Sequence, residues 1–130
     1  MATIKSYTDI NQSKKLAEIL PLESADMYFE EVCNLPKVIV GNYILHNQCM
    51  EDKDYKKTSN PVLSPAWSLS ALLDVLPFPM LYMEMVAGMI LWRCECHFIE
   101  TGEVVKIEHY DNSIDACVAM VEKLNELKLL

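Results

Sequence analysis

Residues 80–110 read MLYMEMVAGMILWRCECHFIETGEVVKIEHY, and this stretch decides the fold. Apolar and polar residues alternate along three runs, separated by turn candidates at residues 86–89 and 100–103 that each contain a glycine. Alternation with a period of two is typical of strands that bury one face. Folding the runs back on each other predicts these cross-strand pairs: Leu81 with Cys94, Met83 with Trp92, Cys96 with Ile107, and Phe98 with Val105.

This pairing gathers apolar residues on one face of a three-stranded antiparallel sheet. That face holds Leu81, Met83, Met85, Ile90, Trp92, Cys94, Cys96, Phe98, Val105 and Ile107. The other face holds Tyr82, Glu84, Arg93, Glu95, His97, Lys106 and Glu108. A slip of one residue in either hairpin would mix the faces, so their consistency supports the sheet. Two details strain it: Glu95 is expected opposite Glu108, and Ala87 is a poor residue for the positive φ of a tight turn.

A helix is expected after the last strand, from Ser113 as its cap to about Leu127. Its apolar residues recur at helical spacing: Ile114, Cys117, Met120, Val121, Leu124 and Leu127. Such a stripe is what the apolar face of the sheet needs as cover.

Earlier segments add further elements. A first helix is expected over residues 11–20, with Thr8 or Asp9 as its cap. A second helix is expected over residues 67–76, opened by Ser64–Pro65, because proline suits a first helical turn.

Between these two helices, strands are expected over residues 27–32 and 37–45, separated by Pro36. Residues 46–60 are polar and carry mixed charges, which indicates a surface loop.

Together these elements predict an α+β fold in one domain, residues 1–130. The predicted architecture is an antiparallel sheet with a helix–three-strand–helix core, about residues 66–128, and helices packed on one face. The pattern leaves open whether residues 27–45 join the main sheet. Helix–three strands–helix also resembles the topology of double-stranded-RNA-binding domains, a likeness of fold alone.

Composition indicates a soluble, cytoplasmic protein. The chain has 52% hydrophobic and 23% charged residues, which favours a packed core. No apolar run opens the sequence, and the longest apolar stretch, residues 77–92, is shorter than a spanning helix and contains Glu84. Five cysteines without a secretory signal indicate reduced thiols. We therefore expect no membrane association and no export.

The charge balance and the glycine count exclude several functions. A net charge of −8 with Arg93 as the single arginine argues against nucleic-acid binding. Three glycines cannot build a phosphate-binding loop or a dinucleotide fingerprint, so no cofactor is expected. An acidic inhibitor that mimics nucleic acid remains open as a function.

The motif Cys94-Glu95-Cys96-His97 is the sharpest candidate for chemistry. On a strand, Cys94 and Cys96 share a face while His97 points away. The expected register brings His109 opposite Cys94. Cys94, Cys96 and His109 are therefore candidate metal ligands, as a structural zinc site would use.

Two observations weigh against that site. The Cys-x-x-Cys spacing of zinc knuckles is missing, and the thiols lie between apolar residues, which favours plain core cysteines. A fourth ligand would have to come from His46 or Cys49 in the polar loop. The same Cys94–His109 pair is the single nucleophile–base pairing that the register suggests. No other catalytic residue is expected.

A second candidate is an interaction patch at Tyr82, Leu91 and Arg93 on the polar face of the sheet. With the neighbouring Met80 and Met89, these side chains would form an apolar surface for an unknown protein partner or a second copy. The leading expectation is accordingly a small non-enzymatic binding or accessory protein.

Three segments resemble a known group of sequences: PLESADM at residues 21–27, WSLSALLDVLP at residues 67–77, and Asp115-Ala116-Cys117. They are similar to a group of short uncharacterised proteins of gut bacteria, often carried on phages or mobile elements. The resemblance covers about half of the chain and implies an accessory role on a mobile element. It implies no catalytic residue, cofactor or named partner.

Overall fold

The computed structural model describes residues 5–41 and 62–130. Their elements follow this order: α1 (Ile10–Ile19), the 3-10 turn η1 (Leu22–Ser24), β1 (Met27–Val32), β2 (Leu35–Val40), β3 (Val62–Ala66), α4 (Leu69–Val75), β4 (Pro79–Val86), β5 (Met89–Phe98), β6 (Glu103–Tyr110) and α5 (Ser113–Glu126). The strands form two antiparallel sheets, ordered β4-β5-β6 and β2-β1-β3. The α+β class and the helix–three-strand–helix core are thus confirmed.

The β4–β5 hairpin has the expected register. Val86 pairs with Met89 around a two-residue turn, and Leu81 lies opposite Cys94. Ala87 and Gly88 both have positive φ, 51° and 80°. Positive φ at both central positions defines the turn whose twist matches a hairpin, so Ala87 adopts the conformation that its side chain disfavours.

The β5–β6 hairpin is shifted by two residues from the expected register. Cys94 lies opposite Ile107, and Phe98 pairs with Glu103 around a four-residue loop. The loop closes through the N–H of Gly102, which donates to the carbonyl of Phe98 at 2.8 Å. A shift of two preserves both faces of the sheet. Charge pairing improves as well, because Glu95 now opposes Lys106.

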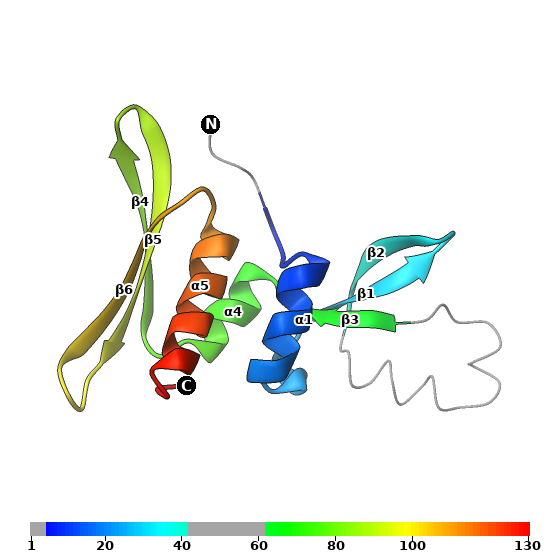
Figure 1. Ribbon diagram of the computed structural model, residues 1–130, viewed down its shortest axis with the longest axis horizontal. Helices are drawn as coiled ribbons and strands as arrows, with labels where there is room; N and C mark the ends of the chain where they lie inside the picture. The colour runs from blue at the N-terminus through cyan, green and yellow to red at the C-terminus, as the bar shows by residue number, and fades with distance from the viewer. Residues whose placement is uncertain (1–4, 42–61) are drawn as a thin grey trace.

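Helix α5 covers the apolar face of the main sheet, mainly over β5 and β6 (Figure 1). The cap is Asn112 rather than Ser113: its side-chain carbonyl accepts the N–H of Asp115 at 2.8 Å. The buried residues include the first five of the expected stripe, whereas Leu127 is exposed beyond the helix end. None of the helices among the described residues is long and apolar enough to cross a membrane.

Residues 27–40 do not join the main sheet but form a second one with β3. Strand β1 is confirmed over Met27–Val32 and lies in the centre, with β2 and β3 on its two sides. Pro36 does not separate two strands; it lies within β2, opposite Glu31. A proline is tolerated there because β2 is an edge strand. Residues 42–45 of the expected second strand, and the expected loop at 46–60, lie outside the described residues.

Ser64–Pro65 does not open the second helix, because both residues belong to β3. This strand is also an edge, which again accommodates proline. Helix α4 begins at Leu69, and Ser68 caps it by accepting the N–H of Ala71 at 3.2 Å.

Helix α1 is capped by Asp9 in a reciprocal arrangement with Gln12, each side chain accepting the other's backbone N–H. The helix packs on β3 and on α5, while α4 also packs on α5. The three helices therefore lie between the two sheets, and Figure 1 shows this layer. One cluster of buried side chains runs through it, from Leu16 and Trp67 to Cys94 and Met120.

Candidate functional site

The described thiols of the main sheet meet a third thiol from α5. Cys94 and Cys96 lie on the face of β5 that α5 covers, and Cys117 of α5 completes the cluster. All three are fully buried. The alternation of a strand and the 3.6-residue period of a helix place them there, because each occupies a core position of its element.

Hydrogen bonding within this cluster shifts the pKa values of the three thiols in opposite directions. Hydrogen bonds from Cys117 and Cys96 lower the pKa of Cys94 relative to that of its two neighbours, while burial opposes the shift. The pKa values of Cys96 and Cys117 are raised, first by hydrogen bonding to Cys94 and then by burial. Burial withholds the sulfur atoms from reagents in solution, so the cluster packs as core and is not poised as a nucleophile.

His109 does not join these cysteines. A bulge between the Trp92 and Cys94 positions of the ladder puts His109 at φ 70°, and Ile107 occupies the position opposite Cys94. The imidazole is 60% exposed and its Nε2 lies 3.9 Å from Glu108. Within residues 5–41 and 62–130, no three metal-binding side chains are arranged to hold an ion. His46 and Cys49 lie outside the described residues.

The three residues of the expected interaction patch do lie together on the outer face of the sheet. Tyr82 pairs with Arg93, and Leu91 pairs with Glu84 on the neighbouring strand. The guanidinium of Arg93 stacks 4.3 Å from the centre of the Tyr82 ring and forms ion pairs with Glu84 and Glu95. All three side chains of the patch are half-buried. The charge of the single arginine is thereby neutralised, and the group of three keeps one net negative charge.

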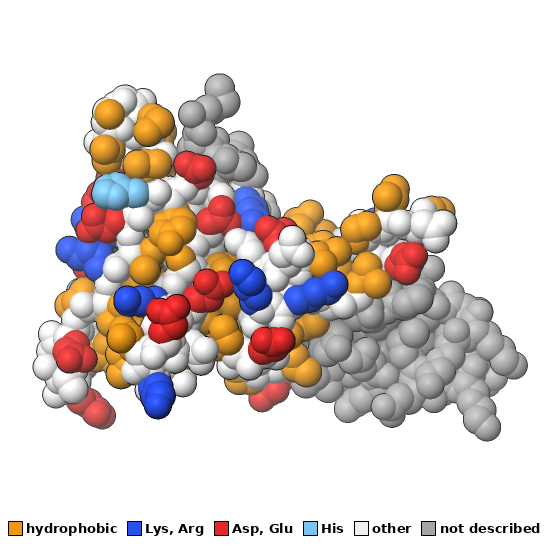
Figure 2. All heavy atoms as spheres, viewed as in Figure 1, with side chains coloured by type: hydrophobic (Ala, Val, Ile, Leu, Met, Phe, Trp, Pro, Cys, Tyr) orange, Lys and Arg blue, Asp and Glu red, His pale blue; other side chains and the backbone are white. Residues whose placement is uncertain are grey.

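Exposed apolar side chains gather at the end of the β4–β5 hairpin. We call this surface the hairpin tip, and it consists of Met83, Met85, Val86, Met89 and Ile90. Their exposed fractions range from 36% to 72%. Hydrophobic atoms are visible at this end of the sheet in Figure 2. The hairpin extends beyond α5, so even the side chains on the helix-facing side, such as Met85, remain uncovered.

The sequence analysis placed Met83 and Met85 on the covered face and included only Met89 of this surface in its candidate apolar patch. The alternation of apolar and polar residues predicts on which face of the sheet a side chain lies. It does not predict how much of that face the helix covers. The signal in the sequence was charge: residues 85–92 contain no charged side chain. An uncharged run of that length at a hairpin turn, in an otherwise acidic chain, is the feature of the sequence that indicates an exposed apolar surface.

An apolar hollow of about 310 Å³ lies at the end of the main sheet that is opposite the hairpin tip. It is lined by Phe78, Pro79, Met80, His97 and Ile99. Phe78 and Ile99 are largely exposed. Strand β4 therefore carries exposed apolar side chains at both of its ends.

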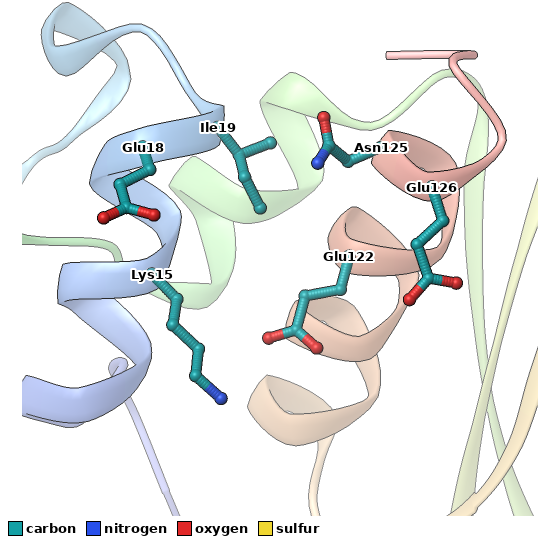
Figure 3. A pocket seen from close by; sticks show the side chains of 6 residues that line it. All are labelled: Lys15, Glu18, Ile19, Glu122, Asn125 and Glu126. Atoms are coloured by element: carbon teal, nitrogen blue, oxygen red, sulfur yellow. The ribbon is translucent and has the colours of Figure 1, made fainter.

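A polar groove of about 390 Å³ runs between α1 and α5, and Figure 3 shows its walls. It is lined by Lys15, Glu18, Ile19, Glu122, Asn125 and Glu126. Its lining combines one lysine with three carboxylates and contains no histidine, thiol or hydroxyl side chain.

Comparison of the chain with family models, with curated proteins and with solved structures yields no match.

Proposed function

We propose that this protein is a small non-enzymatic interaction protein that binds through the hairpin tip. The single observation that carries the proposal is the set of five exposed large apolar side chains there. Exposed apolar side chains gathered in this way mark a contact site for another molecule. Methionine suits the role because its flexible thioether adapts to an irregular partner surface.

The outer face of the main sheet adjoins the hairpin tip and supports the same proposal. Val86 and Met89 pair across the turn on the side that also carries Tyr82 and Leu91. Because Arg93 is held by two carboxylates, a partner can cover this side without burying an unpaired arginine, although the group of three keeps one net negative charge. The expected patch at Tyr82, Leu91 and Arg93 thus becomes the base of the hairpin tip.

Two parts of the proposal have other support. Cytoplasmic residence is proposed because the described cysteines are free thiols, including the exposed Cys33. A role as an accessory protein of a phage or mobile element is proposed from the sequence resemblance.

The experiment compares the tagged full chain with a double variant, Met85→Lys with Ile90→Lys. Each is incubated with host extract, and stoichiometric bound protein is identified by mass spectrometry while self-association is followed by sedimentation. The matched control is Val104→Lys on β6, which changes an apolar residue about as exposed as Ile90 (47% against 43%). We expect binding to survive in the control and to be lost in the double variant. Equal binding by all three proteins, or no association of the unaltered chain, would refute the proposal.

A further inference from the structure

Strand β4 presents a free backbone edge. It is the outer strand of the β4-β5-β6 order, and no strand among the described residues pairs with its other side. Since the two-residue turn makes Val86 and Met89 a hydrogen-bonded pair, alternate residues point their N–H groups away from β5. These outward groups belong to Leu81, Met83 and Met85. They form a ready template for another strand.

The remaining edges of the two sheets carry features that discourage strand pairing. Strand β2 contains Pro36 and Lys37, and β3 contains Pro65. Strand β6 carries Lys106 and is interrupted by the bulge at His109.

Beyond its first residue, β4 has neither proline nor lysine. Its single charge, Glu84, is already paired with Arg93. The side chains that flank its free edge are apolar and exposed: Met80 at 45%, Met83 at 65% and Met85 at 72%. The strand therefore has free backbone groups that can pair with another strand, and its exposed apolar side chains do not oppose that pairing.

The chemistry of β4 matches a second copy of itself. Antiparallel pairing about a twofold axis at Met83 sets Met83 against Met83 and Leu81 against Met85 of the second copy. These are the residues with outward N–H groups, so each pair exchanges two backbone hydrogen bonds. The same register sets Tyr82 opposite Glu84, where the phenol can donate to the carboxylate.

Neighbouring registers fit less well. Moving the axis to Glu84 opposes two like charges, and moving it to Tyr82 sets Met80 against the carboxylate of Glu84. A register displaced by a single residue would bring the apolar face of one copy beside the polar face of the other. Charge also permits this contact, because the chain carries −8 overall while residues 80–93 carry one carboxylate, Glu84, and one arginine, Arg93, which pairs with it.

We propose that two copies of this chain pair antiparallel through β4, centred on Met83, to form one six-stranded sheet. This inference rests on the proposed function and names the partner of the same hairpin. Pairing in this register covers Met83 and Met85 of both copies and removes the free edge of each main sheet.

The first test is the mass of the full chain in solution across a range of concentrations. We expect a species of twice the 14.9 kDa chain. Met83→Lys places two like charges at the axis and should weaken the dimer about tenfold or more. The control Val104→Lys on β6 should leave it unchanged, and circular dichroism verifies that both variants are folded.

A second test reports the register directly and does not depend on Met83→Lys folding. Met83→Cys, in a background with Cys33→Ser and Cys49→Ser, places two thiols opposite each other at the axis. Diamide oxidises the two thiols to one disulfide and is itself reduced to the hydrazine, taking up both protons. We expect a cross-linked dimer within minutes, and none from Val104→Cys treated alike.

A dimer that persists in Met83→Lys, together with no cross-linking of Met83→Cys, would overturn pairing through β4. A monomer at all concentrations would overturn it as well. If that monomer still captures a host protein through Met85 and Ile90, the proposed function stands while the self-pairing fails. If it captures nothing, both fail.

Discussion

The ammonium group of Lys5 donates to Oδ1 of Asp115 at 2.9 Å, joining residues 110 positions apart. The same nitrogen lies 3.1 Å from Asp9 and 2.7 Å from the side-chain oxygen of Gln12. Gln12 in turn donates to Asp115 at 2.8 Å. One lysine therefore ties the first turn of α1 to the first turn of α5.

Replacing Lys5 with methionine should lower the free energy of unfolding by about 1–2 kcal/mol, the scale of lost charge-assisted hydrogen bonds at a partly exposed site. Urea unfolding monitored by circular dichroism measures the change. Lys14→Met is the matched control, because Lys14 is exposed on α1. Equal stability of the two variants would show that the Lys5 contacts contribute nothing.

Asp115 makes stability depend on pH. Burial alone would raise the pKa of its carboxyl, but hydrogen bonds from Lys5, Gln12 and Asn112 outweigh burial and lower it. A lowered pKa stabilises the fold above the unfolded value, about 3.9, and that stability is lost as the pH falls through the folded value. Asp115→Asn should therefore cost about 1 kcal/mol at pH 7 and little at pH 2. Urea midpoints at both pH values measure it, and a constant difference would contradict the assignment.

The thiols should separate sharply by reactivity. Cys33 is exposed, whereas Cys94, Cys96 and Cys117 are fully buried. A short pulse of N-ethylmaleimide on the folded protein should modify Cys33 and leave the three core thiols at least about tenfold slower. Peptide mass spectrometry assigns each site, and labelling in urea is the control for intrinsic reactivity. Rapid modification of Cys94 in the folded state would restore the case for a thiol site.

The β4–β5 turn should be open to stabilisation. Ala87 has a φ of 51°, which costs about 1 kcal/mol for alanine and less for asparagine. Ala87→Asn should raise the unfolding temperature by about 3 °C. Gly88→Ala should lower it, because Gly88 has a φ of +80° although no atom lies within 4 Å of an added Cβ. Calorimetry of the two variants measures both signs.

The main sheet could be predicted because only registers that differ by an even number of residues keep its apolar side chains on one face. A two-residue turn at Ala87–Gly88 left one choice for β4 and β5, and that choice is confirmed. At the next hairpin the turn residues did not determine the loop length. The shift of two residues at Phe98 changed the expected β5–β6 pairs but kept the faces of β6 up to the bulge. Val105 and Ile107 therefore pack on the core as expected, whereas the expected opposition of Cys94 and His109 was wrong.

The second sheet was only partly visible in the sequence. Strand β3 contains Ser64–Pro65, which is typical of a helix start, and nothing local in a five-residue segment reveals that it lies beside β1. Pairing across a long separation in sequence is decided by the packed core and not by local preference. The exposure of Met83 and Met85 was not predicted for a related reason. How far α5 extends over β4 depends on where the helix packs on the sheet, which the sequence pattern does not show.

Helix α5 contacts β5 and β6 on one side and α1 and α4 on the other. Its removal would strip the main sheet of its cover and would also deprive α1, which supports β3, of its neighbour. The main sheet and the part of the fold around α1 and β3 therefore cannot unfold separately, because both pack on α5 directly or through α1. In native-state hydrogen exchange, the slowest amides of β5 and of α1 should therefore share one opening free energy, equal to that of global unfolding.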